Sequence, residues 1–151
     1  MRLVLDTNVL VSALLSPHGP PAQLLDLVLE GQLSLVLSPA ILAEYREVLL
    51  RPRFAFEMEQ VKLLLDTLDT LALHVTPLPW PHLLTDADDE PFIATAHRAC
   101  ATLVTGNEHN YPLPQRENVS VISPRQAIEQ LRDTFHGTTG VQEPGGPDYS
   151  P

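Results

Sequence analysis

The sequence predicts an α/β domain built around a mainly parallel sheet. Short apolar runs alternate with longer segments whose apolar residues recur at helical spacing, and the first run, Leu3 to Leu5, is apolar throughout. An uninterrupted apolar run is typical of a strand buried on both faces, and alternating strands and helices form βαβ units. The acid directly after that run, Asp6, adds a third observation, because chemistry in open α/β sheets lies just beyond the carboxyl ends of the strands.

The first half of the chain supplies the next strand and three helices. A Thr-Asn turn and a second apolar stretch, Val9 to Leu15, follow the first strand. Residues 22–29 lie between prolines that suit a first helical turn and a glycine that suits a helix end. Leu33 to Leu37 is predicted as a strand, and Ser-Pro then begins a helix that reaches about Leu50 before a proline ends it. A third helix is predicted over Phe56 to Leu73, where the leucines fall on one stripe.

The second half repeats the alternation after a proline-rich segment, Thr76 to His82, that we expect to be irregular. An acidic run opens a helix that extends to Ala99, with a proline in its first turn. Ala101 to Thr105 is the next predicted strand and Val119 to Ile122 the last. Ser-Pro then begins a helix that we expect to end near Phe135.

Composition limits the class of protein. The chain has 151 residues, the size of one domain, and we expect a domain over 1–135 followed by a disordered Gly- and Pro-rich tail over 136–151. The apolar runs are too short to cross a bilayer, no basic segment precedes the first one, and the single cysteine suits a reducing compartment. We therefore expect a cytoplasmic protein that does not bind membranes. The net charge of −10 argues against broad, salt-driven nucleic-acid binding, although cations bound to clustered acids would offset part of it.

Glu44 is a second acid of interest. It lies three residues after Ile41 and four before Val48, so it borders the buried face of its predicted helix. A carboxylate there is costly unless a positive or hydrogen-bonding group meets it. The partner is either an arginine in a structural salt bridge or a cation in a site.

The acidic run places Asp86, Asp88, Asp89 and Glu90 within five residues. One interpretation is a helix N-cap with neighbours that the helix dipole stabilises. The other is a cation-binding cluster, because four like charges repel and a cap requires only one. The glycine of a calcium-binding loop is absent, so such a cluster would have to act with acids elsewhere in the chain.

Asp6, Glu44 and Asp89 all fall at or near the same predicted edge of the sheet. Converging carboxylates without cysteine or paired histidine ligands select a hard cation such as Mg²⁺ or Mn²⁺. Such an ion lowers the pKa of a bound water and neutralises charge on a phosphodiester.

Four segments follow one another along the chain: Leu5–Ala13, Leu37–Tyr45, Asp86–Ala96 and Leu103–Asn107. In this order they resemble the successive motifs of PIN domains, as found in the VapC-like toxins of prokaryotic toxin–antitoxin systems. The resemblance covers roughly residues 1 to 135. It implies a three-layer α/β/α sandwich with a mainly parallel sheet of four to five strands.

The resemblance implies that Asp6, Glu44 and Asp89 are the catalytic, metal-binding acids, with Mg²⁺ or Mn²⁺ as the cofactor. Many PIN nucleases carry a fourth Asp where this chain has Asn107, and an amide brings no charge to a second metal. The other supporting residues that the motifs imply are Asn8, Asp86, Asp88 and Thr105, the last as a hydroxyl that orients a metal-bound water.

The function implied by the resemblance is a metal-dependent endoribonuclease in which a cation-activated water attacks RNA phosphorus and leaves a 5′-phosphate and a 3′-hydroxyl. Its implied partners are RNA, an antitoxin protein and a second copy in a homodimer. Arg46, Arg51 and Arg53 are candidates for contacts with phosphates, although arginines near a helix end also complement its dipole.

The remaining candidates have structural interpretations beside them. His97, His109 and Cys100 have no partner at metal-binding spacing, so we expect structural or surface roles. Trp80 and Tyr111 could stack on bases, although packing suits Trp80 better.

Two other functions stay open. A catalytically weak PIN-fold dimerisation or regulatory module would suit Asn107 and the acidic charge. A phosphatase with Asp6 as nucleophile is disfavoured, because Asn8 occupies the place of the usual second Asp and the only lysine, Lys62, lies in the middle of a predicted helix.

Overall fold

The computed structural model describes residues 1–142, with side chains described as far as Thr134. Strands and helices alternate along most of this range. The strands are β1 (Arg2–Leu5), β2 (Ser34–Leu37), β3 (Leu73–His74), β4 (Thr102–Val104) and β5 (Val121–Ile122). The helices are α1 (Thr7–Leu15), α2 (Pro20–Leu29), α3 (Pro39–Leu49), α4 (Met58–Leu71), α5 (Glu90–Ala99) and α6 (Pro124–Gln142).

The five strands form one sheet in the order β3-β2-β1-β4-β5, and every neighbouring pair is parallel. β1 lies at the centre, with Leu3 opposite Leu35 of β2 and Leu5 opposite Val104 of β4. Its residues Leu3, Val4 and Leu5 are buried, as a strand covered on both faces requires. The predicted α/β fold with a parallel sheet is confirmed.

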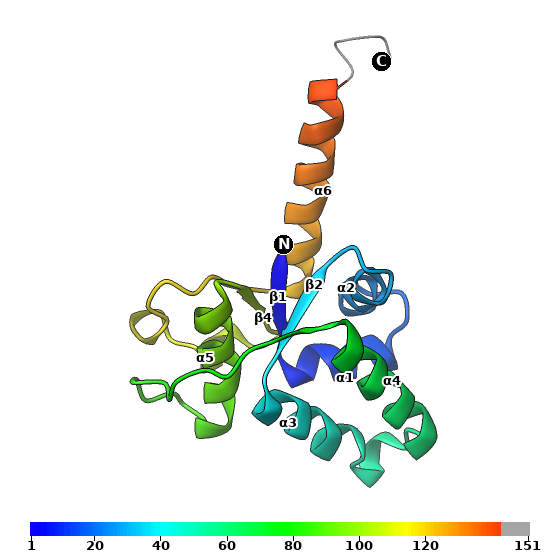
Figure 1. Ribbon diagram of the computed structural model, residues 1–151, viewed down its shortest axis with the longest axis vertical. Coiled ribbons are helices and arrows are strands. Elements are labelled where there is room, and N and C mark those ends of the chain that lie inside the picture. Colours follow the sequence, from blue (N-terminus) through cyan, green and yellow to red (C-terminus); the bar gives the residue numbers. More distant parts are fainter. Residues whose placement is uncertain (143–151) are drawn as a thin grey trace.

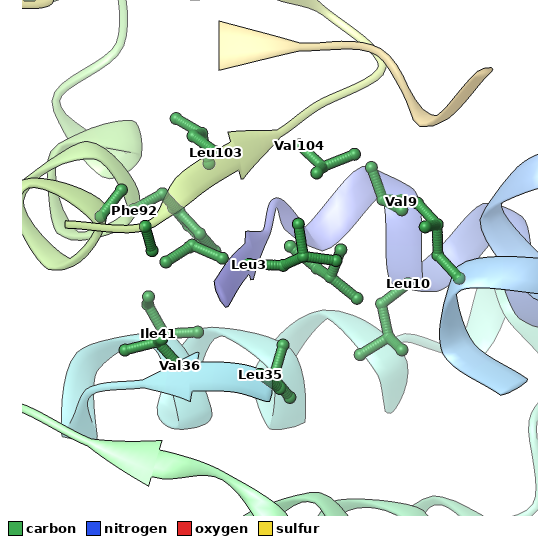
Figure 2. Close-up of a cluster of buried hydrophobic side chains, with 14 of the residues drawn as sticks. Leu3, Val9, Leu10, Leu35, Val36, Ile41, Phe92, Leu103 and Val104 are labelled. Carbon is green, nitrogen blue, oxygen red and sulfur yellow. The ribbon is translucent and has the colours of Figure 1, made fainter. Parts of the chain in front are cut away.

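Helices cover the sheet on two sides. In Figure 1, α5 lies on one side of the central strands and α1, α2 and α4 lie on the other. Apolar side chains from β1, β2, β4, α1, α3 and α5 meet in the core, as Figure 2 shows. Because α1 and α3 begin within two residues of the ends of β1 and β2, the polar residues at these junctions lie at the carboxyl edge of the sheet.

Two parts of the chain differ most from the predicted elements. The third predicted helix ends at Leu71, and Leu73 and His74 form the edge strand β3. Both residues are exposed, so the strand is defined by main-chain pairing with β2 and leaves no apolar pattern in the sequence. α6 extends to Gln142, beyond the expected end near Phe135 and into the tail that we expected to be disordered. The rest of that tail, residues 143–151, lies outside the described residues.

Among residues 1–142, no helix is both long enough and apolar enough to cross a bilayer.

Candidate metal centre at the carboxyl edge of the sheet

Asp6 is a buried carboxylate at the end of the central strand. It is 4% exposed, and its N–H donates to the Val104 carbonyl of β4 at 2.9 Å. The hydroxyls of Thr105 and Tyr111 both donate to Asp6 Oδ2, at 2.9 Å and 3.0 Å. Burial raises the pKa of Asp6, and these hydrogen bonds oppose the rise because they favour the charged form. Asp6 is therefore held by neutral donors instead of by an opposite charge.

Asn8 and Thr105 join the start of α1 to the loop after β4. Asn8 Oδ1 accepts from the Gly106 N–H at 3.0 Å, and Asn8 Nδ2 donates to Thr105 Oγ1 at 3.5 Å. The N–H of Asn107 also donates to Thr105 Oγ1, at 3.0 Å. A Cβ on Gly106 would lie 3.3 Å from Asn8 Oδ1, so a larger residue would crowd this contact. In this structure the Thr105 hydroxyl proton is directed at Asp6, and Asn107 takes part through its main chain.

Two buried tyrosines donate hydrogen bonds near the end of β1, and only Tyr111 donates to Asp6 itself. Tyr111 has no exposed surface, which excludes the base-stacking role considered for it. Tyr45, also fully buried, donates its hydroxyl to the Leu5 carbonyl at 2.6 Å and so ties α3 to the end of β1. Burial is the main reason that the pKa values of both phenols are raised, and the charge of Asp6 adds to it. Sequence reasoning missed Tyr111 as a partner of Asp6, since it lies in an irregular loop without apolar periodicity.

Glu44 is half-buried on α3, on the same helix as Tyr45. Partial burial raises its pKa, and the negative charges of Glu47, Asp88 and Asp6 raise it further, against an opposing effect of Arg51. Within the described side chains Glu44 has no salt bridge. The structural pair that we considered for it is formed instead by its neighbour Glu47, which binds Arg51 at 3.0 Å.

The acidic run forms the short turn Ala87–Asp89 before α5. Asp86 Oδ1 accepts from the Asp88 N–H at 2.9 Å, so Asp86 caps this short turn. The helix itself lacks the cap that we expected from the run, because Asp89 at the N-cap of α5 forms no side-chain capping hydrogen bond. Asp88 is exposed, whereas Asp89 is half-buried. Among the described side chains, Asp89 Oδ2 is buried without a hydrogen-bond partner.

The pKa of Asp89 is raised to about 7. Burial is the largest cause, followed by the negative charges of Asp6 and Asp86 and a smaller effect of Asp88, while a hydrogen bond with the Asn110 side chain lowers it. Asp6 therefore acts electrostatically on both Glu44 and Asp89, which come from different elements. The chain places these three acids around one region of like charge.

The chemistry of this region fits a hard divalent cation, although the ligands do not form a closed set. In the part of the chain that the structure describes, no group of three or more His, Cys, Asp or Glu side chains is arranged to hold a metal ion. The available donors are carboxylate oxygens, which Mg²⁺ and Mn²⁺ prefer. Asp89 Oδ2 and the Thr7 hydroxyl beside Asp6 are both buried without partners, so unused oxygen donors are present.

The three arginines proposed for phosphate binding have different surroundings. Arg51 is engaged with Glu47 through several hydrogen bonds. The Arg53 guanidinium lies 4.8 Å from the centre of the Phe54 ring. Arg46 is exposed in the last turn of α3 and forms no ion pair within the described side chains.

No hydrogen bond joins the remaining candidates to Asp6 among the described side chains. Trp80 is buried and donates its indole N–H to the Gln115 carbonyl at 3.1 Å, as the packing interpretation predicted. His97 lies 3.3 Å from Glu117 at the surface, and His109 is exposed. Cys100 is exposed and follows α5 with a left-handed φ of 53°.

Comparisons with known proteins agree on one family and one fold. A family model described as PIN domain matches residues 2–109. An uncharacterized protein of Methanocaldococcus jannaschii is 28% identical over 142 residues, covering 87% of this chain and 92% of its own.

Solved structures share the fold at low identity. VapBC2 from Rickettsia felis, bound to a DNA fragment from its promoter, aligns with a TM-score of 0.55 at 19% identity, over 82% of this chain and 98% of its own. FitAcB from Neisseria gonorrhoeae aligns with a TM-score of 0.51 at 21% identity, over 81% and 97%. FitAB bound to an IR36 DNA fragment aligns with the same TM-score at 22% identity, over 81% and 94%.

Proposed function

This chain belongs to the PIN domain family, and on that basis we propose that it is a metal-dependent endoribonuclease that hydrolyses RNA phosphodiester bonds. The observation that carries the proposal is the environment of Asp89. Its Oδ2 is buried without a partner, and its pKa is raised to about 7 by burial and by nearby acids that include Asp6. Because Asp6 raises the pKa values of Glu44 and Asp89, the three carboxylates repel one another when they are all charged. A divalent cation would stabilise all of them in the charged form.

We assign the metal ligands to Asp6, Glu44 and Asp89, with Mg²⁺ or Mn²⁺ as the cation. When bound, the cation would lower the pKa of a water molecule and neutralise charge on the scissile phosphate. Asp6 is the fixed member of the set, because two hydroxyls and a buried main chain hold it. Glu44 and Asp89 are the half-buried members, and part of the surface of each is open to solvent.

Asn8, Thr105 and Asn107 support the site by joining the start of α1 to the end of β4, as their hydrogen bonds describe. Asp86 and Asp88 supply further negative charge at its rim, which raises the pKa of Asp89. Among the arginines, Arg46 is the best placed to contact RNA phosphates, because Arg51 and Arg53 already have partners.

We further propose that the protein is the toxin of a toxin–antitoxin pair in the cytoplasm and acts as a homodimer. This rests on the resemblance of its four motifs to those of PIN-family toxins. It also rests on the fold shared with structures obtained as VapBC2 and FitAB, each bound to DNA. The antitoxin would be a separate protein that binds this chain.

A catalytically weak regulatory module is the second candidate. The observation that favours it is Asn107, which places an amide where many PIN nucleases carry a fourth acid and which engages Thr105 only through its main chain. Such a module would keep the fold and the dimer but would not respond to Mn²⁺.

RNA cleavage in Mg²⁺, in Mn²⁺ and in EDTA tests the proposal. We expect cleavage only with the cations, and we expect Asp6→Asn to abolish it while the circular dichroism spectrum stays that of the wild type. Asp26→Asn makes the same chemical change on an exposed residue of α2 and should leave activity unchanged. Equal cleavage in EDTA would refute the metal-dependent mechanism, and an absence of Mn²⁺ binding by calorimetry would favour the regulatory module.

A further inference from the structure

We propose that Tyr111 is a positioning residue of the metal centre, whose hydroxyl holds Oδ2 of Asp6 and so sets the orientation in which this carboxylate would bind a cation. This inference rests on the proposed function, because it assigns Tyr111 a role only if Asp6 is a metal ligand. It concerns a residue that the four sequence motifs do not contain.

The contact between Tyr111 and Asp6 joins parts of the chain that are far apart. The hydroxyl lies 3.0 Å from Asp6 Oδ2, and neither residue is more than 4% exposed. Thr105 donates to the same oxygen at 2.9 Å. Both side-chain donors bind Oδ2, so Oδ1 is left without a side-chain donor among the described residues. The two hydroxyls together restrain the orientation of the carboxylate.

Tyr111 is itself held by its own loop. Its N–H donates to the Glu108 carbonyl at 3.0 Å and closes a single 3-10 turn over Glu108–Asn110. Arg116 donates through Nε to the Tyr111 carbonyl at 2.6 Å and through Nη2 to the Glu108 carbonyl at 3.4 Å. The guanidinium therefore braces the turn from which the phenol reaches Asp6, so the hydroxyl is aimed before any ligand arrives.

Packing alone does not require a hydroxyl at this position, and burying one costs free energy. A phenylalanine would fill nearly the same volume, whereas a buried phenol must find an acceptor or lose the free energy of an unmade hydrogen bond. Here the acceptor is the charged group that we assign to the metal. Partners of this kind orient metal ligands, and their loss typically weakens metal binding by about 10- to 100-fold.

The chain contains a matched control in Tyr45. It is also fully buried, and its hydroxyl also donates one hydrogen bond, but the acceptor is the Leu5 carbonyl at 2.6 Å and not a carboxylate. Tyr45→Phe and Tyr111→Phe delete the same atom from equally buried rings. A purely structural hydroxyl should lower stability in both variants, whereas a positioning hydroxyl should change metal binding only at Tyr111.

The experiment measures the dissociation constant for Mn²⁺ by titration calorimetry in the wild type, Tyr111→Phe and Tyr45→Phe, with melting temperatures recorded in parallel. We expect Tyr111→Phe to weaken Mn²⁺ binding about tenfold or more and Tyr45→Phe to change it less than twofold. We also expect saturating Mn²⁺ to restore RNA cleavage by Tyr111→Phe, with the KM for RNA unchanged, because the lost property is metal affinity.

Wild-type affinity in Tyr111→Phe would overturn the inference and leave the proposed function intact. A wild type that binds no Mn²⁺ would overturn both. If Tyr111→Phe does not fold, 3-fluorotyrosine at position 111 or at position 45 keeps the ring and hydroxyl while changing donor strength. A changed Mn²⁺ dissociation constant at position 111 alone would support the inference, and an unchanged constant at both positions would overturn it.

Discussion

The two sides of the acidic region are built in opposite ways. On the β4 side, Asp6 is buried and receives hydrogen bonds from Thr105 and Tyr111. On the α3 and α5 side, Glu44 and Asp89 are half-buried, and their pKa values are raised by burial and by other acids. One side is therefore satisfied by the fold, and the other is left with unbalanced negative charge.

The difference indicates which part of the site the fold can complete alone. Hydroxyl donors stabilise one carboxylate without adding charge, so Asp6 can be fixed during folding. The charge on Glu44 and Asp89 has no cationic partner among the described ion pairs. In our proposal a divalent cation would balance this charge, and Asp6 would be the ligand that the fold holds in place.

The largest effect is expected when the negative charge of Asp89 is removed from the unsatisfied side. Asp89→Asn keeps the shape of the side chain, and we expect Mn²⁺ binding and RNA cleavage to fall at least about a hundredfold, since a direct ligand should matter no less than its supporting partners. The metal-free variant should melt at a higher temperature than the wild type at pH 8, because like-charge repulsion with Asp6 is relieved. Asp26→Asn is the control for the amide substitution itself. If Mn²⁺ raises the melting temperature of Asp89→Asn as much as that of the wild type, Asp89 is not a metal ligand.

Removal of a donor from the satisfied side should act on stability even without metal. Thr105→Val deletes a buried hydroxyl that donates to a carboxylate, and we expect a loss of about 1.5–3 kcal/mol in the free energy of unfolding. Thr95→Val is the matched control, because Thr95 is equally buried but donates to the neutral Ser38 hydroxyl at 3.0 Å, with an expected loss of about 0.5–1.5 kcal/mol. Urea denaturation in EDTA measures both. A larger loss at Thr95 would show that Asp6 gains little from its donors.

The sequence marked candidate acids of the site better than the groups that hold them. Asp6 follows a buried strand and Glu44 borders an apolar helical stripe, so the apolar pattern made both acids candidates. Tyr111 could not be found in this way, because a 3-10 turn carries no periodic signal and its contact spans most of the chain. The pair between Glu47 and Arg51 has the spacing of neighbours on a helix and was open to prediction, although we considered only phosphate contacts and the helix dipole for Arg51.

The strands were also predicted with unequal success. The central strands were predicted because they are apolar and buried, whereas β3 was missed because its two residues are exposed and its order comes from pairing with β2. The end of α6 was placed too early, since a glycine-rich sequence weakens helix propensity without fixing where a helix ends.

The pH dependence of stability reports on the charge of Asp89. The pKa of Asp89 is about 7 in the folded protein and near 3.8 in the unfolded chain, so between these values the folded protein keeps a proton that the unfolded chain has released. This stabilises the metal-free protein at the acidic end, and the stabilisation is lost as the pH rises towards about 7. Urea midpoints in EDTA at pH 5, 6, 7 and 8 should therefore fall more steeply in the wild type than in Asp89→Asn. Parallel curves for the two proteins would show that Asp89 does not titrate in this range.

The smallest effects are expected from alanine substitutions of two arginines that follow Glu44 in the sequence. Arg46 is exposed and has no ion pair among the described side chains, whereas Arg51 is held by Glu47. If Arg46 contacts a phosphate, Arg46→Ala should raise the KM for RNA about threefold and reduce the slope of log affinity against log salt by about 0.7, the value for one single-strand phosphate contact. Arg51→Ala should change both quantities less and should cost at most about 0.5 kcal/mol of stability, as for exposed pairs one helical turn apart. A larger change of the salt slope in Arg51→Ala than in Arg46→Ala would mean that RNA displaces Glu47 from Arg51. The RNA-binding surface would then extend to the end of α3.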